Sequence, residues 1–97
     1  MLTYVVLATF TDQGIRSVKE STSRADAAKE FAGKFGVKMR EIYWTQGQYD
    51  LAIVCEAQDE ASISAFGLAV ASAGNVRFHT LRAFSRDEMG GILRKLP

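Results

Sequence analysis

The segment Gly47-Gln48-Tyr49-Asp50 lies between two stretches, 37–45 and 49–56, that both have the composition of β-strands. A glycine at the tip of a strand pair supplies backbone conformations that other residues rarely adopt. The segment therefore predicts a β-hairpin, in which Tyr49 and Asp50 open the second strand with their polar ends pointing outward. A hairpin here places two antiparallel strands side by side, and the other elements must be arranged around them.

Strands are also expected near both ends of the chain, at Leu2–Phe10 and Val76–Phe84, because both stretches are rich in β-branched and aromatic residues. A first long helix is predicted between strands one and two. Its start is expected at Ser23, since Asp26 three residues later resembles a capping box, and its end at Gly36, a left-handed C-cap residue. Its apolar stripe comprises Ala25, Ala28, Phe31, Ala32 and Phe35.

Two more helices are predicted from their caps. Asp59 begins one, which ends at Gly74-Asn75 and whose inward positions are Ile63, Phe66, Val70 and Ala73. Ser85 and Glu88 form a capping box for a terminal helix, with an apolar stripe of Met89, Ile92, Leu93 and Leu96. Gly90-Gly91 weakens this helix by about 1 kcal/mol per glycine. It therefore needs to dock on its own subunit or on a neighbour.

The predicted order is β-α-β-β-α-β with an added C-terminal helix, which is the ferredoxin-like α+β arrangement of a four-stranded antiparallel sheet. A chain of 97 residues supports one hydrophobic core, so we expect a single domain spanning residues 1–97. Both long helices then pack on one face of the sheet.

The central strands are apolar on both faces. In strand one, Leu2, Tyr4, Val6, Ala8 and Phe10 point one way, and Val5 and Leu7 point the other. In strand three, Leu51, Ile53 and Cys55 point to one face of the sheet, and Ala52 and Val54 point to the other. A sheet with one face in water alternates apolar and polar residues, so the second face must be covered. A second copy of the chain is the economical cover, and we predict a face-to-face homodimer.

Three separated motifs resemble those of the small bacterial GYD-domain proteins. They are Thr11-Asp12-Gln13-Gly14-Ile15-Arg16, Gly47-Gln48-Tyr49-Asp50, and Gly74-Asn75-Val76-Arg77 with Leu81-Arg82-Ala83-Phe84. The resemblance runs over residues 3–88 and implies a dimeric α/β barrel of ferredoxin-like subunits. It implies little chemistry, because the wider set of dimeric barrels includes cofactor-independent monooxygenases, haem-handling proteins and effector-binding modules of regulators.

The composition excludes several classes of partner. The net charge is +1, from 12 basic and 11 acidic residues, without the basic excess of nucleic-acid binders. Apolar runs are too short for a membrane span, and no signal-peptide pattern begins the chain. Cys55 is the only cysteine, which excludes an internal disulfide and agrees with a reducing compartment. We therefore expect a cytoplasmic protein that binds neither nucleic acid nor membrane.

His79 and Tyr43 are the candidates for acid–base chemistry. His79 is the only histidine and is also a candidate haem ligand, but Arg77 on the same strand face favours a surface or interface position. One histidine without a partner cluster does not make a metal site, and no metal or cofactor is expected. Tyr43 and its neighbour Trp44 must point to opposite faces, and an interface role is favoured. Cys55 is predicted to be a small, buried hydrophobic residue and not a nucleophile.

Four residues are candidates for binding a ligand. Tyr49 and Asp50 offer polar groups at the hairpin end, at the cleft between sheet and helices, although Asp50 also suits a turn-capping role. Arg16 and Arg82 are candidates for a pocket that binds a carboxylate or phosphate. No phosphate-binding loop or serine nucleophile motif accompanies them.

Three interpretations of function remain. The first is a non-enzymatic, homo-oligomeric barrel protein that binds a small molecule. The second is a cofactor-independent enzyme of the same architecture, with His79, Tyr43 or Tyr49 transferring protons. The third is a structural module whose assembly is its function. A deep pocket with a perturbed titratable group favours the second, and a deep pocket of fixed hydrogen-bond groups favours the first.

Overall fold

The computed structural model describes residues 1–97. In chain order the elements are β1 (Leu2–Phe10), α1 (Asp12–Arg16), the 3₁₀ turn η1 (Val18–Glu20), α2 (Ser21–Ala32), the 3₁₀ turn η2 (Gly33–Phe35), β2 (Lys38–Trp44), β3 (Leu51–Ala57), α3 (Glu60–Ala71), β4 (Val76–Ala83) and α4 (Arg86–Leu93). The strands form one sheet in the order β2-β3-β1-β4, with all neighbours antiparallel. This is the α+β arrangement predicted from the sequence.

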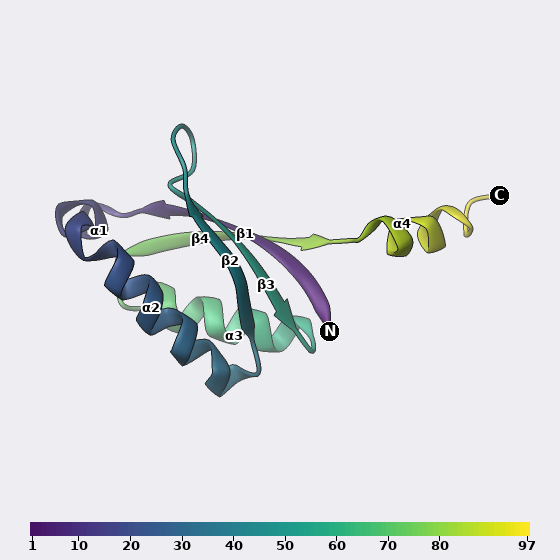
Figure 1. The fold of residues 1–97 in the computed structure, drawn as a ribbon, viewed down its shortest axis with the longest axis horizontal. Coiled ribbons are helices and arrows are strands. Elements are labelled where there is room, and N and C mark those ends of the chain that lie inside the picture. The colour runs from purple at the N-terminus through teal and green to yellow at the C-terminus, as the bar shows by residue number, and fades with distance from the viewer.

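Helices α2 and α3 lie side by side on one face of the sheet and leave the other face without a helix (Figure 1). The hydrophobic core lies between them and the sheet. An aromatic cluster joins the two helices, since the ring centroids of Phe31 and Phe66 are 6.3 Å apart and those of Phe35 and Phe66 are 5.9 Å apart. None of the helices is long and apolar enough to cross a membrane.

The strands divide their side chains between the two faces. In β1, Tyr4, Val6 and Ala8 are buried under the helices, while Val5 and Leu7 lie on the opposite, helix-free face and are only half-buried. In β3 the same alternation buries Leu51, Ile53, Cys55 and Ala57. Within the subunit, the helices therefore bury the apolar side chains of only one face of the sheet, and those of the other face stay partly exposed.

The start of α2 differs from the prediction. The helix begins at Ser21 rather than Ser23, because η1 leads directly into it and supplies a helical turn before the expected cap. The hydroxyl of Ser23 donates to the carbonyl of Glu20 at 3.0 Å instead of accepting from the backbone. At the other end, Gly36 has φ +69°, as expected for a left-handed terminal residue.

The caps of α3 and α4 are confirmed. The Asp59 carboxylate accepts a hydrogen bond from the backbone N–H of Ser62 at 2.8 Å. In α4, the Ser85 hydroxyl accepts from the Glu88 N–H at 3.1 Å, and the Glu88 carboxylate accepts from the Ser85 N–H at 2.9 Å. Ala73 is not an inward helical position, because α3 ends at Ala71 and Ala73 is exposed.

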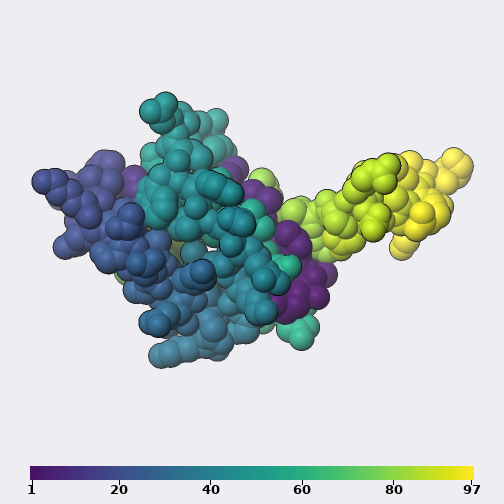
Figure 2. Space-filling view, in the orientation of Figure 1, coloured from purple at the N-terminus to yellow at the C-terminus, as the bar shows by residue number.

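Helix α4 does not dock on its own subunit. It extends away from the sheet beyond the end of β4, as the yellow segment of Figures 1 and 2 shows. Its apolar stripe is therefore open to solvent, with Met89 43% and Leu93 52% exposed. Of the two docking partners expected for this helix, only a neighbouring molecule remains.

Candidate functional site

Asp50 ties the hairpin loop to the end of β1. Its carboxylate accepts a hydrogen bond from the backbone N–H of Phe10 at 2.8 Å, and its own N–H donates to the carbonyl of Ala8 at 2.8 Å. Strand β3 begins only at Leu51, so Tyr49 and Asp50 belong to the connection and do not open the strand as predicted. The Asp50 carboxylate therefore has a backbone partner, which lies on β1 and not within the turn.

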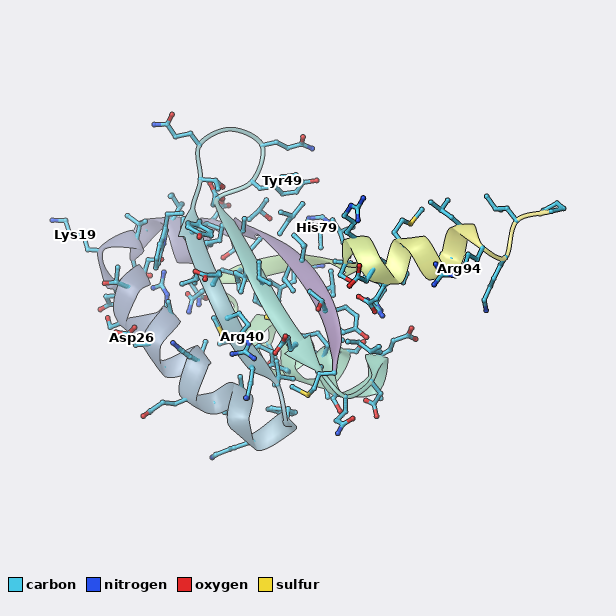
Figure 3. The ribbon with its side chains drawn as sticks, turned by 45° about the vertical axis from the view of Figure 1, so that its right-hand side comes forward. Lys19, Asp26, Arg40, Tyr49, His79 and Arg94 are labelled. Carbon is cyan, nitrogen blue, oxygen red and sulfur yellow. The ribbon has the colours of Figure 1, made fainter.

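Tyr49 and His79 lie against each other on the helix-free face. Their rings meet edge to face with centroids 5.6 Å apart, and Figure 3 shows them reaching toward one another from the hairpin loop and from β4. His79 is opposite Leu7 in the β1–β4 register, which places it beside the half-buried apolar residues of β1. No sequence signal indicated this pair, because the two residues are distant along the chain.

Tyr43 and Trp44 point to opposite faces, as predicted. Tyr43 is opposite Ala52 and exposed on the helix-free face. Trp44 points toward the helices, where its indole Nε1–H donates to the hydroxyl of Ser21 at 2.9 Å.

The structure does not bring Arg16 and Arg82 together. Arg82 is opposite Tyr4, and its guanidinium donates to the carbonyls of Thr3 and Ala83 and lies over the Phe84 ring at 4.5 Å. Arg16 is in α1, beyond the far end of β1 at Phe10. Six residues of strand separate the two ends, or roughly 20 Å. Within one subunit they do not share an anion pocket.

The helix-free surface of the sheet, here called the open face, carries a continuous set of side chains. They are Thr3, Val5, Leu7 and Thr9 of β1, Ala52, Val54 and Glu56 of β3, Glu41 and Tyr43 of β2, and Arg77, His79 and Leu81 of β4. Its centre is apolar, and Leu81 is 50% exposed. A solvated antiparallel face is ordinarily polar, so this composition is typical of a surface that pairs with another.

The opposite side of the sheet encloses a cavity of about 460 Å³ under α2 and α3, here called the chamber. Small residues of the two helices, including Ala25, Ala28 and Gly67, line it and leave the space unfilled. Figure 2 shows a narrow opening where α2 meets β2. The chamber is large enough for a small organic molecule. The chamber is a cleft between the sheet and the helices, where a ligand site was predicted, but Tyr49 and Asp50 do not line it.

The lining of the chamber changes character along its length. Near the start of β1 the lining is apolar, with Phe31, Phe66, Ile63 and Cys55. Burial raises the pKa of the Cys55 thiol to about 11, so this group is neutral at physiological pH. Beside α1 the lining is polar, with Ser21, Arg24 and Asn75. Sequence reasoning missed these three, because polar residues next to a helix end normally face solvent.

Comparisons with known proteins agree with this description. The model of the GYD domain matches residues 4–93. The chain is 36% identical over 84 residues to a Thermus thermophilus protein named glutamine synthetase and cystathionine beta-lyase binding protein, covering 86% of this chain and 88% of that relative. It also resembles the crystal structure of TTHA0845, likewise from Thermus thermophilus, with a TM-score of 0.56, 24% identity, and coverage of 88% of this chain and 95% of the other.

The structural similarity supports the α+β fold. The match to the family model spans nearly the whole chain and includes β1 from Tyr4 onward and every later strand and helix. This protein therefore belongs to the GYD domain family.

Proposed function

We propose that this protein is a cytoplasmic, single-domain and non-enzymatic binding protein that forms a homodimer by pairing two copies of the open face. The observation that carries the proposal is the apolar centre of that face, formed by Val5, Leu7, Val54 and Leu81. Burying one such side chain contributes roughly 1.5–3 kcal/mol. In a twofold-symmetric dimer each of these four side chains is buried in both copies, so each contributes twice.

The placement of the titratable candidates supports binding rather than catalysis. Asp50 is engaged by the backbone of β1, and Cys55 is a neutral thiol. His79 and Tyr49 lie on the open face and not in the chamber, so the sheet separates the sole histidine from the chamber. In the proposed dimer, the exposed side chains of α4 pack on the partner copy.

A charge placed in the open face tests the pairing. We expect the native protein to sediment as a dimer at micromolar concentration and Leu7→Asp to sediment as a monomer, because each interface would bury two unpaired carboxylates. Leu68→Asp is the matched control, since Leu68 is 73% exposed on α3. The proposal is contradicted if the native protein sediments as a monomer at every concentration. In that case the sedimenting masses of Leu68→Asp and Leu7→Asp would also be the same.

The relative from Thermus thermophilus suggests protein partners as a second function. Because that protein is named for binding glutamine synthetase and cystathionine beta-lyase, and the match covers most of both chains, we propose that this chain binds enzymes of the same two kinds. Biolayer interferometry against both enzymes from the source organism tests this, with serum albumin as the control surface. Equal signals on the enzymes and on albumin would exclude the interaction.

A further inference from the structure

The polar end of the chamber offers hydrogen-bond donors that have no acceptor. Ser21 is buried, with 8% of its surface exposed, and its oxygen accepts from the indole of Trp44, which leaves its own O–H unpaired. Asn75 uses its side-chain oxygen to accept from Gln13, which leaves its NH₂ group unpaired. Both residues line the chamber, and Asn75 also reaches solvent, where its bond to Gln13 lies.

Arg24 adds a positive charge to these donors. Its side chain is 26% exposed and lines the chamber. The two Nη atoms donate to the carbonyls of Ser17 and Gly14 and to the Ser17 hydroxyl, so the Nε–H and one Nη2–H have no acceptor. Its nearest carboxylate, the exposed Glu20, is 3.8 Å away and compensates the charge only weakly.

The donors lie close together at this end. Ser21 and Arg24 are three residues apart on α2 and therefore share a helix face. Arg24 donates to the carbonyl of Gly14, and Gly14 packs directly on the carbonyl of Asn75. No aspartate or glutamate is among the residues that line the chamber, so its one charged lining residue is positive, with only the weak compensation of the exposed Glu20 outside it.

We propose that the chamber binds a small monocarboxylic acid with an apolar tail. The carboxylate accepts hydrogen bonds from Arg24, Ser21 and Asn75, and the tail lies along α2 toward the aromatic rings of Phe31 and Phe66. From Ser21 to Phe31 is ten residues of continuous helix, or about 15 Å, which sets the length of the ligand. The chamber lies on the side of the sheet opposite the open face, so the inference holds whether or not the protein dimerises there.

Matched ligands test the head group. Calorimetry with decanoate, kept below its micelle concentration, is expected to give saturable binding with one site per chain. Decan-1-ol has the same tail without the charge, and its affinity is expected to be lower by at least about tenfold. Decylamine, with the opposite charge, is expected not to compete with decanoate. Absence of decanoate binding at millimolar concentration, or equal affinity for the acid and the amine, overturns the proposal.

Matched variants test the residues. Arg24→Gln is expected to lower decanoate affinity at least about tenfold while leaving decan-1-ol affinity unchanged. Lys29→Gln removes the same charge from an exposed position of α2 and is expected to change neither affinity. Because Arg24 also holds the end of α1, Arg24→Lys is the second variant, which keeps the charge and is expected to retain most of the binding. A loss of acid binding in Lys29→Gln equal to that in Arg24→Gln would refute the site.

The single thiol gives an independent readout of location. Cys55 lines the apolar end of the chamber, but it is buried and its pKa is raised, so N-ethylmaleimide alkylates it slowly. In alkaline solution, with the reaction followed over hours, bound decanoate is expected to slow this alkylation further. Decanoate that binds without changing this rate lies elsewhere, and the assignment to the chamber is then wrong.

Discussion

At the scale of single residues, Gly14 shows how closely two parts of the backbone approach. A Cβ atom at this position would overlap the carbonyl of Asn75, and that carbonyl accepts the hydrogen bond of the Thr11 N–H at 3.1 Å. The glycine thus allows α1 to sit against the chain leaving α3, beside the polar end of the chamber. Because the neighbouring atoms belong to the backbone of Asn75, no flexible side chain could move aside to make room for a Cβ atom at Gly14.

We expect Gly14→Ala to lower the free energy of unfolding by about 2–4 kcal/mol, because the added methyl group must displace backbone. Gly33→Ala is the control, since a Cβ there meets no atom within 4 Å. Urea unfolding monitored by circular dichroism measures both. If the two variants unfold at the same urea concentration, the contact between Gly14 and Asn75 is not as described.

Asp50 provides a second test at this scale. Replacing it with Ala removes the acceptor of the Phe10 N–H and is expected to cost about 1–3 kcal/mol of stability, whereas Asn keeps a side-chain oxygen and should cost less. Thermal unfolding of the two variants at neutral pH measures the difference. Equal losses in both would mean that the charge, and not the hydrogen bond, is what the fold requires.

At the scale of elements, the sequence was sufficient where the signal is local. Strand β1 has the predicted bounds, and the caps at Asp59 and Ser85 are where their spacing indicated. The positions of Arg24 and His79 could not be predicted, because they depend on helix placement and strand register. An apolar stripe such as that of α4 indicates that the helix needs a surface to pack on, but it does not identify that surface.

Helix α4 should respond to acid. The backbone N–H of Ser85 and, secondarily, the side chain of Arg82 hold the pKa of the Glu88 carboxyl below its ordinary value. A lowered folded-state pKa stabilises the helix above the unfolded pKa, and this contribution disappears as the pH falls through the folded value. Amide exchange in α4, relative to that in β1, is therefore expected to accelerate as the pH falls below 4.5, the ordinary pKa of a glutamate carboxyl. Glu88→Gln should lack this acceleration.

At the scale of the whole molecule, strand register limits how two copies of the open face can pair. His79 on the edge strand β4 and Tyr43 on the opposite edge strand β2 are level with each other across the sheet, through Leu7 and Ala52. In the proposed dimer, a twofold axis running along the strands places β4 of each copy opposite β2 of the other and keeps every residue at its level. His79 of each copy then faces Tyr43 of the other, whereas Arg77 and Glu41 lie about four residues of strand, or roughly 13 Å, apart.

Trp44 gives the molecule an optical reporter of its own. It is the only tryptophan in the chain, and its indole N–H donates to the hydroxyl oxygen of Ser21, a residue that lines the chamber and whose own O–H has no acceptor in the protein. An acceptor that captures this hydrogen polarises the hydroxyl and strengthens its bond to the indole. Occupancy of the chamber should thus change the wavelength of the intrinsic fluorescence, and whole metabolite collections can be screened on the unlabelled protein.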